Sequence, residues 1–226
     1  MSIRPADNIT QHVCAGVLIK ERWILTAQDC LVDTWSDVKD KNGMNLFTKL
    51  KKIVVAPKYN TTLDKFHNYT LYEPEKTFCL PSYKAVEFMK ETNFGMIKLK
   101  TEIPLGPLSP YNFQLILMND WLDGKNRTPL VDPTETIVSA GWANGNSSEP
   151  SIYLEETILE RLSQKKCEKM KHFYNSSFNI CALRIVISEQ SKVDCAGDLG
   201  GPAVFRDKNY GEILVGIISA MDFSCT

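Results

Sequence analysis

Short apolar stretches alternate with clusters of turn-forming residues along most of this chain. Eight of these stretches predict β-strands: Val17 to Ile19, Trp23 to Leu25, Ile53 to Val55, Met96 to Leu99, Phe113 to Leu117, Ile137 to Ala140, Ala203 to Phe205 and Ile213 to Ile218. Short strands that are separated by turn signals are typical of an all-β barrel or sandwich. The pattern therefore predicts an all-β fold.

Two segments break this pattern. Leu154 to Tyr174 is rich in Glu, Lys, Arg and Leu, which predicts a short helix from Ser163 to Phe173 with Ser163 as its cap. Asn119 to Pro133 contains two prolines, a glycine and many polar residues, which predicts a linker between two halves of the chain. We expect little other helix.

Composition narrows the class of protein. With 226 residues, 43% hydrophobic and 23% charged, the chain can bury the core of one compact unit or of two small barrels. The formal net charge of -1 provides no general field for nucleic acid or an anionic membrane. No apolar run approaches the ~18 residues that a membrane-spanning helix needs. We expect neither nucleic acid nor a membrane span.

Cysteines and glycosylation motifs indicate the compartment. The seven cysteines include no CxxC pair and no His/Cys cluster at zinc spacing, so they favour disulfides over a metal site. Six Asn-x-Ser/Thr motifs are candidate glycan acceptors, at Asn8, Asn60, Asn68, Asn126, Asn146 and Asn175. Both features predict a secreted, extracellular glycoprotein with no metal and no cofactor.

Several motifs carry a family resemblance, which extends from about Cys14 to Cys225. Trp23-Ile-Leu-Thr-Ala-Gln-Asp-Cys30 resembles the segment of the chymotrypsin/trypsin family that ends Thr-Ala-Ala-His-Cys around the catalytic histidine. Asn93-Phe-Gly-Met-Ile-Lys-Leu99 is similar to that family's Asp-Ile-Ala-Leu-Ile-Lys-Leu, and Cys195-Ala-Gly-Asp-Leu-Gly-Gly-Pro202 resembles its Cys-x-Gly-Asp-Ser-Gly-Gly-Pro. Ser139-Ala-Gly-Trp142 and Val215-Gly-Ile-Ile-Ser219 resemble two further landmarks, in the correct order.

The resemblance implies a specific fold. It predicts two six-stranded antiparallel β-barrels, with an N-terminal half at residues 1–120, a C-terminal half at residues 121–226 and one short intermediate helix. The family continues beyond the position of Thr226 through another strand and a C-terminal helix, so we expect that helix to be absent here. Either the sequence is truncated, or the second barrel is incomplete and exposes apolar surface that another chain could cover.

The resemblance also implies three disulfides, Cys14 to Cys30, Cys167 to Cys181 and Cys195 to Cys225. Each would stabilise the fold by roughly 3 kcal/mol in the chain-entropy model. Cys79 is left over. Two interpretations of it stay open, a buried thiol and an intermolecular disulfide to another chain.

The positions of the catalytic triad are all substituted. Acyl transfer in this family needs a hydroxyl nucleophile, an imidazole base and a carboxylate that orients the imidazole. The histidine, aspartate and serine positions hold Asp29, Asn93 and Leu199, and a leucine side chain has no atom that can attack a carbonyl. These substitutions predict that the chain is not an enzyme but a pseudoprotease without peptidase activity.

Other parts of the family's cleft are expected to be vestigial. Gly197 and Asp198 would form the remains of the oxyanion loop, in which the glycines serve the backbone turn and Asp198 must find a partner other than a new amino terminus. The remains of the specificity pocket would be Val193, Ser219, Ala220 and Met221. Met221 would either obstruct this pocket or serve only in loop packing.

Three functions remain open. The first is a binding or regulatory protein of an extracellular protease cascade such as complement or another immune cascade, with an unidentified protein partner. The second is a polyanion or heparin-binding protein, through Lys165, Lys166, Lys169, Lys171 and His172 together with Lys49, Lys51 and Lys52. The third is an enzyme with a relocated centre, which would use Asp29 and one of the three histidines, His12, His67 or His172.

Overall fold

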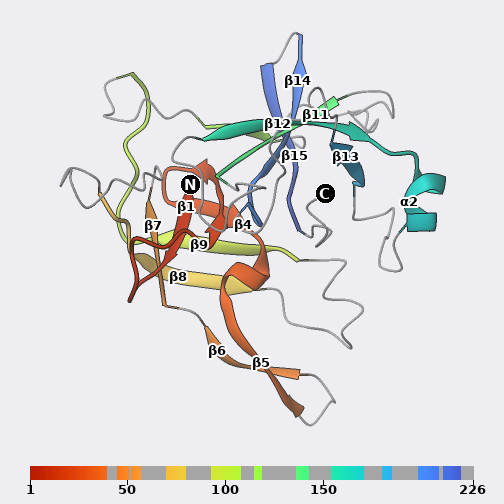
Figure 1. Ribbon diagram of the computed structural model, residues 1–226. Helices are drawn as coiled ribbons and strands as arrows, with labels where there is room; N and C mark the ends of the chain where they lie inside the picture. Colours follow the sequence, from red (N-terminus) through yellow and green to blue (C-terminus); the bar gives the residue numbers. More distant parts are fainter. Residues whose placement is uncertain are drawn as a thin grey trace, which may run out of the picture.

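The computed structural model describes residues 1–39, 45–50, 52–56, 70–79, 93–107, 115–118, 136–142, 154–170, 180–184, 198–208 and 211–219. Their strands are β1 (Ser2–Pro5), β2 (Cys14–Ala15), β3 (Val17–Lys20), β4 (Trp23–Thr26), β5 (Val32–Lys39), β6 (Asn45–Leu50), β7 (Ile53–Ala56), β8 (Pro74–Cys79), β9 (Gly95–Leu99), β10 (Leu117–Met118), β11 (Thr136–Gly141), β12 (Glu155–Arg161), β13 (Ala182–Arg184), β14 (Pro202–Asp207) and β15 (Gly211–Ile217). The helical elements are η1 (Gln28–Cys30) and α2 (Gln164–Met170). The predicted all-β, trypsin-like fold with one short helix is confirmed (Figure 1).

The described strands form four sheets. Two of them, in the orders β2-β1-β7 and β3-β4-β9-β8, come from the first half of the chain, and β5 pairs with β6 in a hairpin. A six-stranded sheet, in the order β10-β15-β14-β11-β12-β13, contains all strands of the second half. Figure 1 shows the hairpin reaching away from the other sheets.

Alternation of buried and exposed residues explains the central strands. In β9 the pattern runs buried, exposed, buried, intermediate, buried from Gly95 to Leu99, as expected for a strand with one face on the core. Ile97 is paired with Ile24 of β4, and both side chains are fully buried. The same core includes Val204, Leu214 and Ile217 of the six-stranded sheet, so one apolar cluster joins the two parts of the chain.

Some elements differ from the prediction. The helix α2 begins at Gln164, where the main-chain oxygen of Ser163 accepts hydrogen bonds from Lys166 and Cys167. The preceding residues, Glu155–Arg161, form strand β12 and were not predicted as a strand. Four of the seven residues of β12 are charged, so apolar periodicity could not reveal it.

Two of the implied disulfides lie within the described residues. One joins Cys14 of β2 to Cys30 of η1, and the other joins Cys167 of α2 to Cys181, just before β13. Each closes a short loop, with sequence separations of 16 and 14 residues. Cys195 and Cys225 lie outside the described residues, so the third disulfide stays a prediction.

The division into halves at residues 120 and 121 also stays a prediction, because this boundary lies outside the described residues. β10 precedes the boundary in the sequence and pairs in parallel with β15. The residues after Ser219, where the family's C-terminal elements would follow, are not described either.

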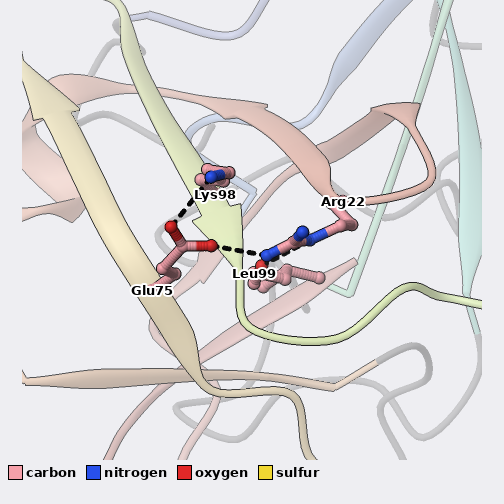
Figure 2. A network of polar contacts seen from close by, with 4 residues as sticks. All are labelled: Arg22, Glu75, Lys98 and Leu99. Carbon is pink, nitrogen blue, oxygen red and sulfur yellow. Dashed lines mark hydrogen bonds and ion pairs between the residues drawn. The ribbon is translucent and has the colours of Figure 1, made fainter.

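A network of hydrogen bonds and ion pairs links β8, at the edge of its sheet, to β9 and to the turn before β4 (Figure 2). Glu75 of β8 accepts hydrogen bonds from Lys98 of β9, at 2.8 Å, and from Arg22, in the turn before β4. The Arg22 side chain also donates to the main-chain oxygen of Leu99 at 2.9 Å. Because these side chains are partly exposed, the network contributes little to stability.

Candidate functional site

Asp29 and Asn93 lie in direct contact. The short helix η1 positions Asp29, and Asn93 directly precedes the residues that lead into β9. The Asn93 side-chain oxygen accepts a hydrogen bond from the Asp29 main-chain nitrogen at 3.1 Å, and Asn93 Nδ2 donates to Asp29 Oδ2 at 3.0 Å. The structure thus brings together two of the residues that the sequence singled out.

The Asn93 amide also connects the two halves of the chain. Its Nδ2 donates to the main-chain oxygen of Ser219, just after β15, at 2.8 Å. Asn93 is buried, and burial makes the loss of such contacts costly. The amide therefore ties η1 to the segment after β15 and uses both its donor and acceptor groups in doing so.

Leu199 contacts β2 and the end of η1 through its main chain. Its main-chain oxygen accepts a hydrogen bond from Ala15 at 2.9 Å and lies 3.5 Å from Cys30 Sγ. Its half-buried side chain packs against the main core. Among these three positions there is no hydroxyl or imidazole, so their polar chemistry consists of one carboxylate and one amide.

Asp198 has a partner that sequence reasoning did not identify. Its side chain is almost fully buried, and Oδ1 accepts a hydrogen bond from the Trp142 main-chain nitrogen at 2.6 Å. A Cβ atom built on Gly141 would lie only 1.9 Å from Asp198 Oδ1. Glycine at position 141 thus allows the carboxylate to approach the backbone and be satisfied there.

Trp142, whose main-chain nitrogen donates to Asp198, also contacts a buried polar cluster that consists of Ser2, Arg4 and His12. The His12 ring meets the Trp142 ring edge-on, with centroids 5.2 Å apart. His12 Nδ1 shares a hydrogen bond of 2.9 Å with Ser2 Oγ, and Arg4 donates to the same hydroxyl at 3.1 Å. The sequence suggested His12 only as one of three histidines that a relocated catalytic centre with Asp29 could use. It did not predict this cluster, because the polar residues of β1 gave no signal that they are buried.

Gly200 is a second glycine at which a side chain would collide with its neighbours. Its φ of +84° lies in the left-handed region that favours glycine. A Cβ atom there would lie 2.2 Å from Thr26 Oγ1 and 2.5 Å from the Ala15 main-chain oxygen. We use the name junction for the contact region of Asn93, Gly141, Asp198 and Gly200, where the two halves of the chain meet.

Several predicted site residues lie outside the described residues: Gly197, Val193, Ala220, Met221, Asn60, Asn68, Asn126, Asn146 and Asn175. Of the candidate glycan acceptors, Asn8 is described, and it is exposed. Its side-chain oxygen accepts a hydrogen bond from Thr10, the threonine of the same motif, at 2.8 Å.

Cys79 is a free, half-buried thiol in β8. Burial raises the pKa of the Cys79 thiol to about 11. A thiol in this state is mostly protonated at neutral pH and therefore reacts slowly. The alternative of an intermolecular disulfide stays a prediction.

No helix in the described part of the chain is both long and apolar enough to cross a membrane. Within the same residues, no three His, Cys, Asp or Glu side chains come together as a possible metal site.

Comparison with known proteins gives consistent matches. The family model described as Trypsin matches residues 3–226. The chain is 25% identical to Trypsin 5G1 of Aedes aegypti over 93% of its length, and 23% identical to human Granzyme M over 95%. It is 24% identical to the CLIP domain-containing serine protease B15 of Anopheles gambiae over 94% of its length.

The chain is shorter than these relatives. The matches cover 66% of Trypsin 5G1, 71% of Granzyme M and 55% of the CLIP-domain protease. Similarity over part of a relative's length does not by itself establish the activity, substrates or partners of the whole protein.

The comparisons contradict the prediction that this chain is not an enzyme. The matching family is enzymatic, and the relatives above carry the names of proteases. The prediction inferred the class of the whole protein from the side chains at Asp29, Asn93 and Leu199, whereas the similarity extends over nearly the entire chain.

The match covers the described strands of both halves together with the junction between them. It agrees with the mostly β architecture and with the two disulfides that the structure contains. The chain therefore belongs to the trypsin family of serine proteases.

Proposed function

We propose that this member of the trypsin family acts as a binding or regulatory protein in an extracellular protease cascade. The observation that supports it most is the hydrogen bonding of Asn93 to Asp29 and Ser219. Its amide groups are committed to holding these segments in place. This is the arrangement expected of a scaffold whose fixed backbone geometry presents surfaces to other proteins.

The proposal includes the assignment of individual positions. Asp29, Asn93 and Leu199 would correspond to the histidine, aspartate and serine of the family's triad. Their mutual placement, through Asn93 and through the Leu199 oxygen near Cys30, agrees with this assignment. Asp198 would be the carboxylate of the oxyanion loop, here satisfied by the Trp142 main chain.

An extracellular location is part of the proposal. Disulfides persist in oxidising compartments and are rare in the cytosol. The bonds between Cys14 and Cys30 and between Cys167 and Cys181 support secretion, as does the exposed glycosylation motif at Asn8. The cascade context comes from similarity to a CLIP domain-containing serine protease.

Affinity capture tests the binding function. The disulfide-bonded protein, made in a secretory host, is immobilised and exposed to extracellular fluid, and retained proteins are quantified by mass spectrometry. We expect a saturable partner at fixed stoichiometry, retained equally by the Cys79→Ser variant if Cys79 is a buried thiol. Loss of the partner in that variant would instead support the intermolecular disulfide.

Peptide hydrolysis is measured on the same samples, because the family is enzymatic. Intact partner recovered after long incubation supports a regulatory function. A partner that is cut, with cleavage abolished in a purified variant at Asp29 or Asn93, would be a substrate and would overturn the proposal. Failure to retain any saturable partner would overturn it as well.

A further inference from the structure

The connection between β1 and β2 contains an exposed turn with the motif Asn8-Ile9-Thr10. The two strands pair in antiparallel fashion, with Ile3 opposite Cys14, so residues 6–13 form a loop between neighbouring strands. Asn8 and Thr10 are both exposed. A motif of this kind, with a residue other than Pro in the middle, is an acceptor for N-linked glycans in a protein that passes through the secretory pathway.

Main-chain hydrogen bonds fix this turn. The Asn8 nitrogen donates to the Pro5 oxygen at 3.2 Å, and the Asn8 oxygen accepts from the Gln11 nitrogen at 3.1 Å. Arg4, which is fully buried, donates to the main-chain oxygen of Ile9 at 2.8 Å. The backbone of the motif is therefore held by contacts that do not involve the Asn8 side chain.

The Asn8 side chain contacts other exposed side chains. Its Oδ1 accepts a hydrogen bond from Thr10 Oγ1 at 2.8 Å, and its Nδ2 donates to Gln11 Oε1 at 3.3 Å. Both hydrogen bonds are exposed, and water can replace an exposed partner at little cost in free energy. The stability of the fold therefore depends little on this side chain.

The Asn8 amide can keep both contacts when a sugar is attached. An asparagine Nδ2 carries two hydrogens, and an N-glycosidic bond replaces one of them, so the other can still donate to Gln11. Oδ1 is unchanged and can still accept from Thr10. Because Asn8 is exposed, the sugar would extend into solvent without any change of the turn.

The second residue of the motif provides the specific signal. Asparagine is favoured in turns for structural reasons, so Asn8 alone would not indicate a modification. Thr10 adds the hydroxyl that the motif requires, and this hydroxyl is exposed and meets the Asn8 amide itself. The turn thus presents the complete acceptor motif on the surface.

We propose that Asn8 carries an N-linked glycan. In the transfer, Asn8 Nδ2 forms a bond to the anomeric carbon of the first sugar, and the bond from this carbon to the diphosphate of a lipid-linked oligosaccharide breaks. The amide loses one proton, and the lipid diphosphate leaves with the bonding electron pair. The donor and its transferase belong to the secretory pathway, so the inference rests on the extracellular location proposed above and not on the binding function.

Peptide mapping of the protein made in a secretory eukaryotic host tests the proposal. Tryptic digestion gives a peptide of residues 1–20, because Pro5 blocks cleavage after Arg4 and the next basic residue is Lys20. This peptide contains no other acceptor motif. Enzymatic removal of N-glycans in heavy-oxygen water converts a glycosylated asparagine to a labelled aspartate, which mass spectrometry distinguishes from unmodified Asn8. Medium and cell extract are both analysed, so the result does not depend on the amount secreted.

Variants of the turn separate the motif from its surroundings. Asn8→Gln removes the acceptor, and Thr10→Ala removes the hydroxyl while it leaves Asn8 in place. Thr10→Ser keeps a hydroxyl and therefore the motif. Gln11→Ala is the matched control, because it removes a neighbouring exposed side chain outside the motif. Thermal unfolding verifies that every variant is folded.

We expect most of the wild-type peptide to carry the label, and Thr10→Ser and Gln11→Ala to keep it. Asn8→Gln and Thr10→Ala should each lose the mass of one glycan from the intact protein. A wild-type peptide without the label in both medium and cell extract would overturn the proposal, as would a Thr10→Ala variant that keeps the label.

Affinity capture with the same proteins judges the binding function separately. If Asn8 is unmodified and a saturable partner is still captured, the proposed function stands and this inference alone fails. If Asn8 carries a glycan and no partner is captured, the glycan stands and the proposed function fails.

Discussion

The junction buries polar side chains, whereas the β13 edge of the described six-stranded sheet exposes apolar side chains. In the junction, Asn93 and Asp198 are buried and their polar atoms meet main-chain or side-chain partners. At the edge, Leu183 and Ile180 are exposed beside the lysines of α2. Substitutions in the junction should therefore change the stability of the fold, whereas substitutions at the edge should change it little.

The largest effect is expected at Gly141. Alanine there would place a methyl group 1.9 Å from Asp198 Oδ1, so the buried carboxylate would have to leave its hydrogen bond with Trp142. We expect Gly141→Ala to lower the free energy of unfolding by about 3 kcal/mol. Urea denaturation measures it. The control is Gly216→Ala, which meets no atom within 4 Å and should be nearly neutral. Equal effects of the two substitutions would contradict this description of the junction.

Removal of the Asn93 amide should have the next largest effect on stability. Asn93→Leu keeps the approximate size of the side chain but leaves the Asp29 main-chain nitrogen and the Ser219 oxygen without this partner. We expect a loss of about 2 kcal/mol in the free energy of unfolding. The exposed Asn8 serves as control, because Asn8→Leu should cost much less in protein made without glycans.

The reactivity of Cys79 tests whether its thiol, in a strand at the edge of its sheet, is shielded from solvent. Burial raises the pKa of this thiol from 9.0 to about 11, so at pH 8 the reactive thiolate is roughly 100-fold scarcer than for an unperturbed thiol. Alkylation by iodoacetamide should be slower than in urea by a similar factor, as followed by intact mass. Rapid alkylation of the native protein would mean that Cys79 is accessible.

The smallest effect is expected in the network of Figure 2. The hydrogen bond from Lys98, together with the charges of Lys98 and Arg22, lowers the pKa of Glu75. A lowered pKa in the folded state contributes stability above the unfolded pKa, and this contribution disappears as pH falls through the folded pKa. Glu75→Gln should thus be slightly less stable than wild type at pH 7 and converge with it as the pH falls through the lowered folded-state pKa of Glu75. A difference that persists at low pH would exclude an electrostatic origin.

Part of the fold could be predicted because the apolar periodicity of several strands and the order of the family motifs are visible in the sequence. β3, β4 and β9 coincide with predicted strands, and the spacing of cysteines agrees with both described disulfides. β1 and β12 could not be found in this way. Ser2 and Arg4 of β1 are buried polar residues that stabilise each other, and β12 is mostly charged because much of it faces solvent.

Motif alignment named Asp29 and Asn93 as candidate site residues, and the structure shows that their side chains are in contact. The hydrogen bond of Asn93 to Ser219 and that of Asp198 to Trp142 could not be predicted, because they depend on backbone geometry. Sequence patterns do not encode main-chain partners at large separation. The prediction that the chain is not an enzyme was wrong for a different reason: it was drawn from three side chains, whereas the similarity to an enzymatic family extends over nearly the entire chain.

Hydrogen–deuterium exchange of the protein alone and with its captured partner tests the proposed binding function most directly. We predict slower exchange in exposed segments outside the junction, with the partner intact and with unchanged exchange around Asn93 and Ser219. Slower exchange around Asn93 and Ser219, together with cleavage of the partner, would contradict the account and place the partner in a substrate cleft.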